Sequence, residues 1–222
     1  MIVLADNDII LKLAQCDLLQ VLPDIFGQTW SQLFITPTAK FQLLPKKTGK
    51  ALSKCGNQET LDRLTQFLAQ AQVLTAAQDQ ELLDKLDNIE DIHGDNGGEK
   101  LLFAAAVELE NPIVITGDRT ALRAVLENKE IIPTVFSALQ DSVVTFETAL
   151  LLAMNQLGFA IVKSKILASP LLTSSKPDGM LRFAIKSETG EADFVECLCS
   201  YSKEVIPLLA FKSHLPPALN QP

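Results

Sequence analysis

Ile2-Val3-Leu4-Ala5-Asp6-Asn7-Asp8 is the stretch that decides the fold. Four apolar residues run directly into three polar ones, which is typical of a buried strand that ends in a turn. Apolar residues at roughly helical spacing follow, beginning with Ile9, Ile10 and Leu13, so a helix comes next. The stretch therefore predicts a strand, a turn and a helix, with carboxylates where the strand ends.

Two further strands are predicted in the same way. Residues 33–36 are mostly apolar and stop at Pro37, after which a helix begins near Thr38. Residues 112–116 form a short apolar run before Gly117-Asp118, and another helix follows. Strands that alternate with helices build a parallel sheet, and ligands of such sheets gather outside the carboxyl ends of the strands. The sequence therefore predicts an α/β fold with Asp6 and Asp118 at that edge.

Helical patterns occupy much of the remaining chain. Residues 59–70 carry leucines on one stripe, and a helix-like segment runs from about residue 78 to residue 86. Residues 99–107 would form a helix with apolar residues on nearly every face, which predicts a central helix that is buried on most sides.

The pattern changes beyond about residue 135. Residues 145–157 and 194–209 have helical apolar spacing, whereas residues 169–179 contain two prolines and a serine pair, as linkers do. We therefore predict a three-layer α/β/α domain with a central parallel sheet and a mostly helical C-terminal extension. The predicted parts are residues 1–157, residues 158–215 and a frayed tail at 216–222.

Composition limits the classes of partner. No run reaches the ~20 apolar residues of a membrane span, and the N-terminus lacks a secretory leader, so we expect a cytoplasmic protein. Four cysteines without a CxxC pair, and only two histidines, predict neither disulfides nor structural zinc. The net charge of −8 opposes nucleic-acid binding by bulk electrostatics, so an RNA partner needs a local site.

Five lysines at positions 40, 46, 47, 50 and 54 form the most obvious basic cluster. We interpret it first as a solvated loop, because most charge runs are solvated. If the chain binds nucleic acid, the candidate contacts are Lys46, Lys47 and Arg119. Arg119 and Arg123 lie one helical turn apart and equally fit an exposed stripe.

Carboxylates that meet at one sheet edge repel one another. At ~5 Å and an effective dielectric of ~20, each pair costs on the order of 3 kcal/mol. Such groups must be protonated, spread apart or neutralised by a cation, and oxygen ligands suit Mg²⁺ or Mn²⁺. The alternative for Asp6 and Asp118 is helix capping, and for Glu99 a favourable interaction with a helix dipole.

Three stretches resemble the PIN-domain family of metal-dependent ribonucleases. Residues 2–8 are similar to its opening strand and acid, residues 95–106 to its central acidic turn and helix, and residues 116–122 to the turn after its fourth strand. The resemblance covers roughly residues 1–135 and implies RNA cleavage with Mg²⁺ or Mn²⁺. It implies catalytic, metal-binding roles for Asp6, Glu99 and Asp118. Further candidates are Asp95 as a metal ligand, and Asp8, Gln42 and Thr116 as secondary residues.

One departure from the family pattern concerns the helix after the second strand. The family usually places a Glu there, whereas this chain offers Lys40, Phe41 and Gln42. An amide oxygen can coordinate a cation but cannot neutralise it, so the site lacks one charge.

Three functions follow from these observations. The first is a PIN-like ribonuclease, as in toxin–antitoxin pairs, although the extension makes this chain longer than a bare toxin. The second is a PIN-like binding or assembly module without catalysis, with a protein partner or a second copy of the chain. The third is a phosphatase of the haloacid-dehalogenase type, in which Asp6 is the nucleophile and Asp8 the acid/base. That type expects another Asp shortly after Gly117-Asp118, where Leu122 stands.

Overall fold

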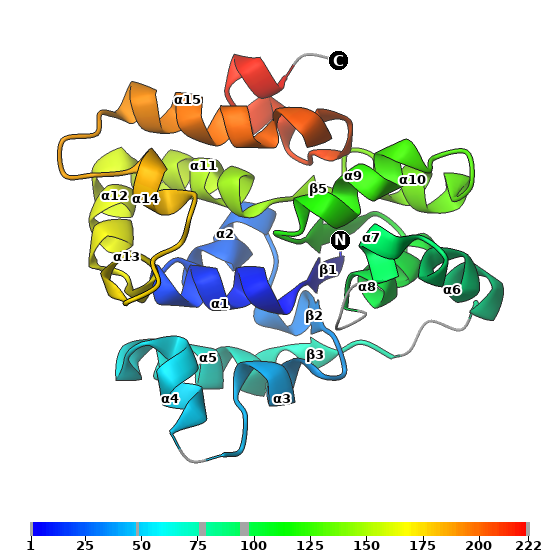
Figure 1. The fold of residues 1–222 in the computed structure, drawn as a ribbon, viewed down its shortest axis with the longest axis horizontal. Helices are drawn as coiled ribbons and strands as arrows, with labels where there is room; N and C mark the ends of the chain where they lie inside the picture. The colour runs from blue at the N-terminus through cyan, green and yellow to red at the C-terminus, as the bar shows by residue number, and fades with distance from the viewer. Residues whose placement is uncertain (1, 48, 76–78, 94–97, 221–222) are drawn as a thin grey trace.

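A five-stranded parallel sheet forms the centre of the protein. The computed structural model describes residues 2–47, 49–75, 79–93 and 98–220 (Figure 1). The strands lie side by side in the order β3-β2-β1-β4-β5. Their bounds are Ile2–Ala5 for β1, Leu33–Ile35 for β2, Gln72–Val73 for β3, Pro112–Ile115 for β4 and Val143–Val144 for β5.

The central position of β1 follows from its composition. Val3, Leu4 and Ala5 are fully buried, as a strand covered on both faces must be. Val3 pairs with Leu33 of β2 on one side and with Ile113 of β4 on the other. The chain adds β2 and β3 on one side of β1 and then β4 and β5 on the other side, so its direction of travel reverses between β1 and β4. Ligands of doubly wound sheets bind at this reversal.

Helices lie on both sides of the strands. Figure 1 shows α1 and α5 on one side, and α6, α8 and α10 on the other. The α-helices are α1 Asn7–Gln15, α2 Leu22–Phe26, α3 Ala39–Leu43, α4 Lys50–Cys55, α5 Gln58–Gln70, α6 Gln80–Asp87, α7 Glu90–His93, α8 Gly98–Glu108, α9 Arg119–Glu127, α10 Pro133–Leu139, α11 Phe146–Leu157, α12 Phe159–Ala168, α13 Pro170–Thr173, α14 Leu181–Ala184 and α15 Glu191–Ser202. The 3₁₀ helices are η1 Leu19–Val21, η2 Trp30–Gln32, η3 Lys203–Leu208, η4 Lys212–His214 and η5 Pro217–Leu219.

The central helix is α8. Its Leu102, Phe103 and Ala104 are completely buried, and the helix contacts both β1 and β4 as well as α10. The small side chains at residues 104–106 let neighbouring backbones come close. Because α8 packs behind the two central strands, its first turn lies near the strand ends where Asp6 and Asp118 stand.

The C-terminal segments pack against the same core. Helix α15 lies along α11 with Phe194 and Leu198 completely buried (Figure 1). Residue Leu209 forms an isolated parallel bridge with Val143, so the chain after α15 extends the sheet beyond β5. Leu219 is also completely buried. The division of the chain into a domain, an extension and a tail stays a prediction.

The predicted α/β class with a parallel sheet is confirmed. Three details differ from the sequence patterns. The helix expected over 194–209 ends at Ser202 and continues as 3₁₀ turns, where Pro207 has no N–H to donate. The linker expected over 169–179 contains α13, and β3 and β5 had no counterparts among the predicted strands.

The cysteines and the apolar helices were also the subject of expectations from the sequence. The four cysteines, all within the described ranges, are free thiols, and three of them are buried. Among the described residues, no helix combines the length and the apolar character that a membrane span needs.

Candidate functional site

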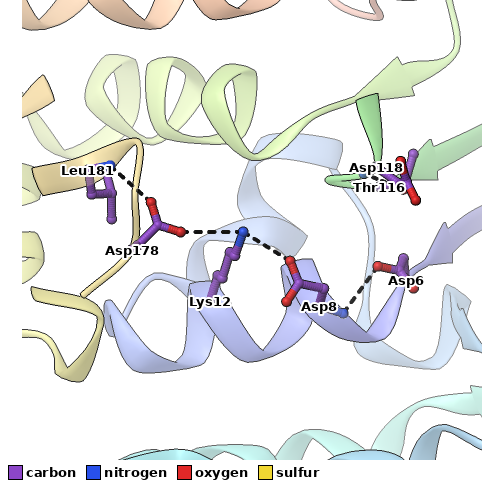
Figure 2. Close-up of polar contacts among 7 residues, drawn as sticks. All are labelled: Asp6, Asp8, Lys12, Thr116, Asp118, Asp178 and Leu181. Carbon is purple, nitrogen blue, oxygen red and sulfur yellow. Dashed lines mark hydrogen bonds and ion pairs between the residues drawn. The ribbon is translucent and has the colours of Figure 1, made fainter. Parts of the chain in front are cut away.

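Asp6 stands at the junction of β1 and α1. Its carboxylate caps α1 by accepting a hydrogen bond from the Asp8 backbone N–H at 3.1 Å (Figure 2). The backbone N–H of Asp6 donates to Ile115 at the end of β4, so the residue bridges the two central strands. Only 7% of Asp6 is exposed. Capping thus explains how Asp6 is held in place without explaining why a buried carboxylate is needed there.

Asp118 repeats this arrangement after β4. Its carboxylate accepts a hydrogen bond from Ala121 N–H at 3.0 Å and so caps α9. Thr116 is completely buried, and its Oγ1 accepts a hydrogen bond from the Asp118 N–H at 3.1 Å (Figure 2). Thr116 therefore shapes the turn that presents Asp118.

Glu99 approaches the two aspartates from the first turn of α8. The preceding Gly98 lies so close to Asp6 that a β-carbon on it would be 3.8 Å from Asp6 Oδ1. Glu99, Asp6, Asp8 and Asp118 all line one cavity of about 580 Å³. The residues predicted from the strand ends are therefore brought to one place by the fold, whereas Asp95 lies outside the described residues.

Burial and crowding disfavour the charged form of these acids. Burial is the largest cause that raises the pKa of Glu99 to about 7, and the charges of Asp6, Asp118 and Asp8 add to it. Burial also raises the pKa of Asp6 above its usual value, although the backbone N–H groups of Asn7 and Asp8 oppose the shift. A bound cation would relieve this strain, because opposite charge favours the carboxylate form.

The donor set fits Mg²⁺ or Mn²⁺ by its chemistry, since it consists of carboxylate oxygens. In the part of the chain that the structure describes, no group of three or more His, Cys, Asp or Glu side chains is arranged so that it could hold a metal ion. The oxygen donor set and the lack of a three-ligand group agree if only one or two carboxylates bind the cation directly. Mg²⁺ usually keeps several waters and takes only one or two carboxylates.

Gln42 lies on the other side of Asp6. It lines a second cavity of about 360 Å³, together with Asp6, Glu99, Asn7 and Lys54. Gln42 Oε1 accepts a hydrogen bond from Asn7 Nδ2, and the Lys54 ammonium donates to the Gln42 backbone carbonyl at 2.9 Å. The position where the resemblance expects an acid is therefore near the site and holds an amide beside a lysine.

Asp8 turns away from Asp6. Its carboxylate forms an ion pair with Lys12 at 3.0 Å, and Lys12 also pairs with Asp178 at 3.4 Å (Figure 2). Burial lowers the pKa of Lys12, but the two carboxylates outweigh this effect and raise it. Asp178 is in turn held by the Leu181 N–H at 2.9 Å. A chain of charges thus runs from the C-terminal segments to the candidate site.

The arginines of α9 are also in contact with the C-terminal segments. Arg119 and Arg123 line the 580 Å³ cavity together with Glu204. Arg119 donates to the Tyr201 carbonyl at 3.3 Å and lies over the Tyr201 ring, and Arg123 pairs with Glu204 at 3.7 Å. The candidate nucleic-acid contact Arg119 is therefore at the cavity but already has protein partners.

The other candidate contacts, Lys46 and Lys47, are exposed between α3 and α4. Lys46 lies over the ring of Phe41 at 5.6 Å.

Sequence patterns missed several residues of the site. Lys12 had a usable signal, because it follows Asp8 by four positions on a helix. Lys54, Asp178 and Glu204 had none, since only packing of distant segments brings them to the cavities or to Lys12.

Comparisons with models of known protein families, with curated proteins and with solved structures found no match for this chain.

Proposed function

We propose that the chain is a PIN-like nuclease that hydrolyses RNA phosphodiester bonds with Mg²⁺ or Mn²⁺. One observation carries the proposal: Asp6, Asp8, Glu99 and Asp118 line a single cavity where the order of the parallel strands reverses. The order of these acids along the chain supports the resemblance to the PIN family. Arg119 and Arg123 line the same cavity and are suited to a phosphate.

The chemistry divides between the cation and the chain. Asp6, Glu99 and Asp118 are the residues that would hold the cation, one or two of them directly and the rest through its water molecules. When bound, Mg²⁺ or Mn²⁺ supplies positive charge against the phosphodiester and acidifies water. Hydrolysis joins the water oxygen to phosphorus and breaks one P–O bond, and the proton that water loses passes to the departing oxygen. The two capped aspartates are held by backbone N–H groups, so they are oriented before a substrate arrives.

A binding or assembly module without catalysis is the second candidate. Gln42 supports it, because the amide stands near Asp6 where the family has a further acid and is already hydrogen-bonded to Asn7. The phosphatase reading has less support. It needs Asp8 as a proton donor beside Asp6, whereas the Asp8 carboxylate forms an ion pair with Lys12 (Figure 2).

Cleavage of a labelled RNA oligonucleotide in MnCl₂ tests the proposal. We expect the wild type to cleave and Asp118→Asn to lose about two orders of magnitude or more in rate. Asn caps helices about as well as Asp, so this variant should keep its fold, which its thermal midpoint checks. The matched control is Asp24→Asn at an exposed position of α2, which should cleave like wild type.

Equal cleavage by wild type and Asp118→Asn would show that the cavity is not the catalytic site. A Mn²⁺-induced rise of the wild-type melting midpoint without any cleavage would favour the binding module.

A further inference from the structure

Charge is unevenly distributed along this acidic chain. Residues 25–58 contain five lysines and no Asp, Glu or Arg, so the rest of the chain holds all 27 acidic residues against 14 basic ones. This segment supplies β2, α3 and α4. A segment of 34 residues without an acid is therefore locally positive in a protein whose net charge is −8.

The lysines of this segment are exposed and without acidic partners. Lys40, Lys46, Lys47, Lys50 and Lys54 are all exposed, and no ion pair joins any of them to an acid within the described ranges. The ion pairs found among the described residues lie elsewhere, on α1, α5, α6, α8, α9 and the C-terminal segments. Because no ion pair with an acid has to break, binding of an anion by these lysines has no such energetic cost.

An exposed aromatic ring belongs to the same segment and lies beside one of these lysines. Phe41 on α3 is 62% exposed, and the Lys46 ammonium lies over its ring. We name the Phe41 side chain and the five lysines the basic-aromatic face. Exposed rings flanked by cations are what proteins use to bind single-stranded nucleic acids, because bases stack on the ring while lysines follow the phosphates.

The basic-aromatic face adjoins the candidate site. Gln42, the residue after Phe41, and Lys54 line the 360 Å³ cavity with Asp6 and Glu99. The Lys54 ammonium donates a hydrogen bond to the Gln42 backbone carbonyl, which places it between the basic-aromatic face and the candidate site. In Figure 1, α3 and α4 both lie below α1. A single-stranded nucleic acid that lies on these lysines can therefore continue into the acidic cavities.

We propose that the basic-aromatic face binds the single-stranded RNA that flanks the bond held at Asp6, Glu99 and Asp118, with Phe41 stacking on an unpaired base. The choice of RNA rests on the proposed nuclease function, whereas the surface itself rests on charge and exposure. An acidic protein could pair with the lysines, but it has no base that would stack on the exposed Phe41 ring.

Fluorescence anisotropy of a labelled oligouridylate of about 12 nucleotides, in EDTA to prevent cleavage, tests this surface. The variant Lys46→Glu/Lys47→Glu/Lys50→Glu should weaken binding at least about tenfold and should reduce the slope of log K against log salt by about 2. The matched control, Lys129→Glu/Lys176→Glu/Lys186→Glu, changes the net charge equally at exposed lysines elsewhere and should bind like wild type.

A second comparison tests the stacking. Phe41→Ala should weaken binding of the single strand about fivefold to a hundredfold. Its control is Phe183→Ala, which removes an equally exposed ring that also lies under a cation, Arg182, and should change little. A duplex of the same length should bind the wild type more weakly than the single strand.

Equal losses from the two triple variants, or from the two phenylalanine variants, would overturn the proposal, as would stronger binding of the duplex. Binding that depends on this surface, combined with no cleavage in Mn²⁺, would refute the nuclease function alone. Cleavage that the first triple variant leaves unchanged would refute the docking surface alone.

Discussion

Replacing Glu99 by Gln removes a carboxylate that the folded protein accommodates only at a cost. Glu99 is half-buried beside Asp6, Asp118 and Asp8, and its pKa is raised from 4.5 to about 7, first by burial and then by those charges. In the unfolded chain the same group loses its proton near its usual pKa. Between about pH 4.5 and pH 7 the folded protein therefore binds more protons than the unfolded chain, and stability falls as pH rises.

The magnitude follows from the size of the shift. A rise from 4.5 to about 7 corresponds to roughly 3 kcal/mol at 1.36 kcal/mol per unit of pKa. Solvent reaches part of the side chain and screens its neighbours, so we expect about 1–2 kcal/mol. The substitution also removes the favourable interaction of the Glu99 carboxylate with the α8 dipole, which lowers stability. This loss is smaller, about 0.3–1 kcal/mol at an exposed position. The net prediction is that Glu99→Gln is more stable than wild type at pH 8.

Urea unfolding at pH 4 and at pH 8, in EDTA, measures this difference. At pH 4 both proteins carry a neutral side chain at position 99, so their free energies of unfolding should agree. At pH 8 the variant should be the more stable one. Glu110→Gln is the matched control, because Glu110 is exposed and its loss should leave the pH dependence unchanged.

Millimolar Mn²⁺ should reverse the order at pH 8, because the wild type keeps the carboxylate that helps to hold the cation. The reasoning is refuted if Glu99→Gln and wild type keep the same difference in stability at pH 4 and pH 8.

Two other predictions concern contacts that join the C-terminal segments to the rest of the protein. Lys12→Met should cost about 1–3 kcal/mol in urea unfolding, because the mostly buried carboxylate of Asp178 loses its cation, and an unchanged midpoint would contradict this. Gly56→Ala should cost about 2–4 kcal/mol, since φ is +86° and a β-carbon would lie 2.5 Å from Pro170 Cβ. Gly27→Ala, with φ +59° but open space, should cost only about 1 kcal/mol, and equal losses would speak against the Pro170 contact.

The C-terminal segments have a structural part in the candidate site. They hold three of the cations that lie at or beside its acids, and one of their own acids lines the larger of the two cavities. The contacts are Asp178 with Lys12, Tyr201 with Arg119, and Glu204 with Arg123. A phosphate that reaches the arginines has to compete with Glu204. The extension is therefore part of the wall around the acids.

Strand prediction from the sequence succeeded where burial is continuous. Residues of β1 and β4 are apolar along their whole length, and each strand ends at a polar turn, so pattern alone located them. The strands β3 and β5 have two residues each, and both residues of β3 are exposed. No period can be detected over two residues. These strands exist because they pair with β2 and β4.

The acidic positions follow the same division. Asp6 and Asp118 were predictable, because an acid that directly follows a buried parallel strand lies at the carboxyl edge of the sheet. Glu99 was predictable as the start of a helix apolar on all sides. Their burial, and the resulting rise in the pKa of Glu99, depend on how α8 packs behind β1 and β4.

The stretch Ile2-Val3-Leu4-Ala5-Asp6-Asn7-Asp8 by itself determined a buried strand that delivers a carboxylate to the sheet edge, because the side-chain pattern of a strand and its turn is local. Which partners that carboxylate meets was decided by the tertiary structure. Lys54 and Glu204 reach the cavities from distant parts of the chain, and their local sequences carry no sign of it. Contacts between distant segments depend on the packing of the whole core, and that packing sets the charge balance of the candidate site.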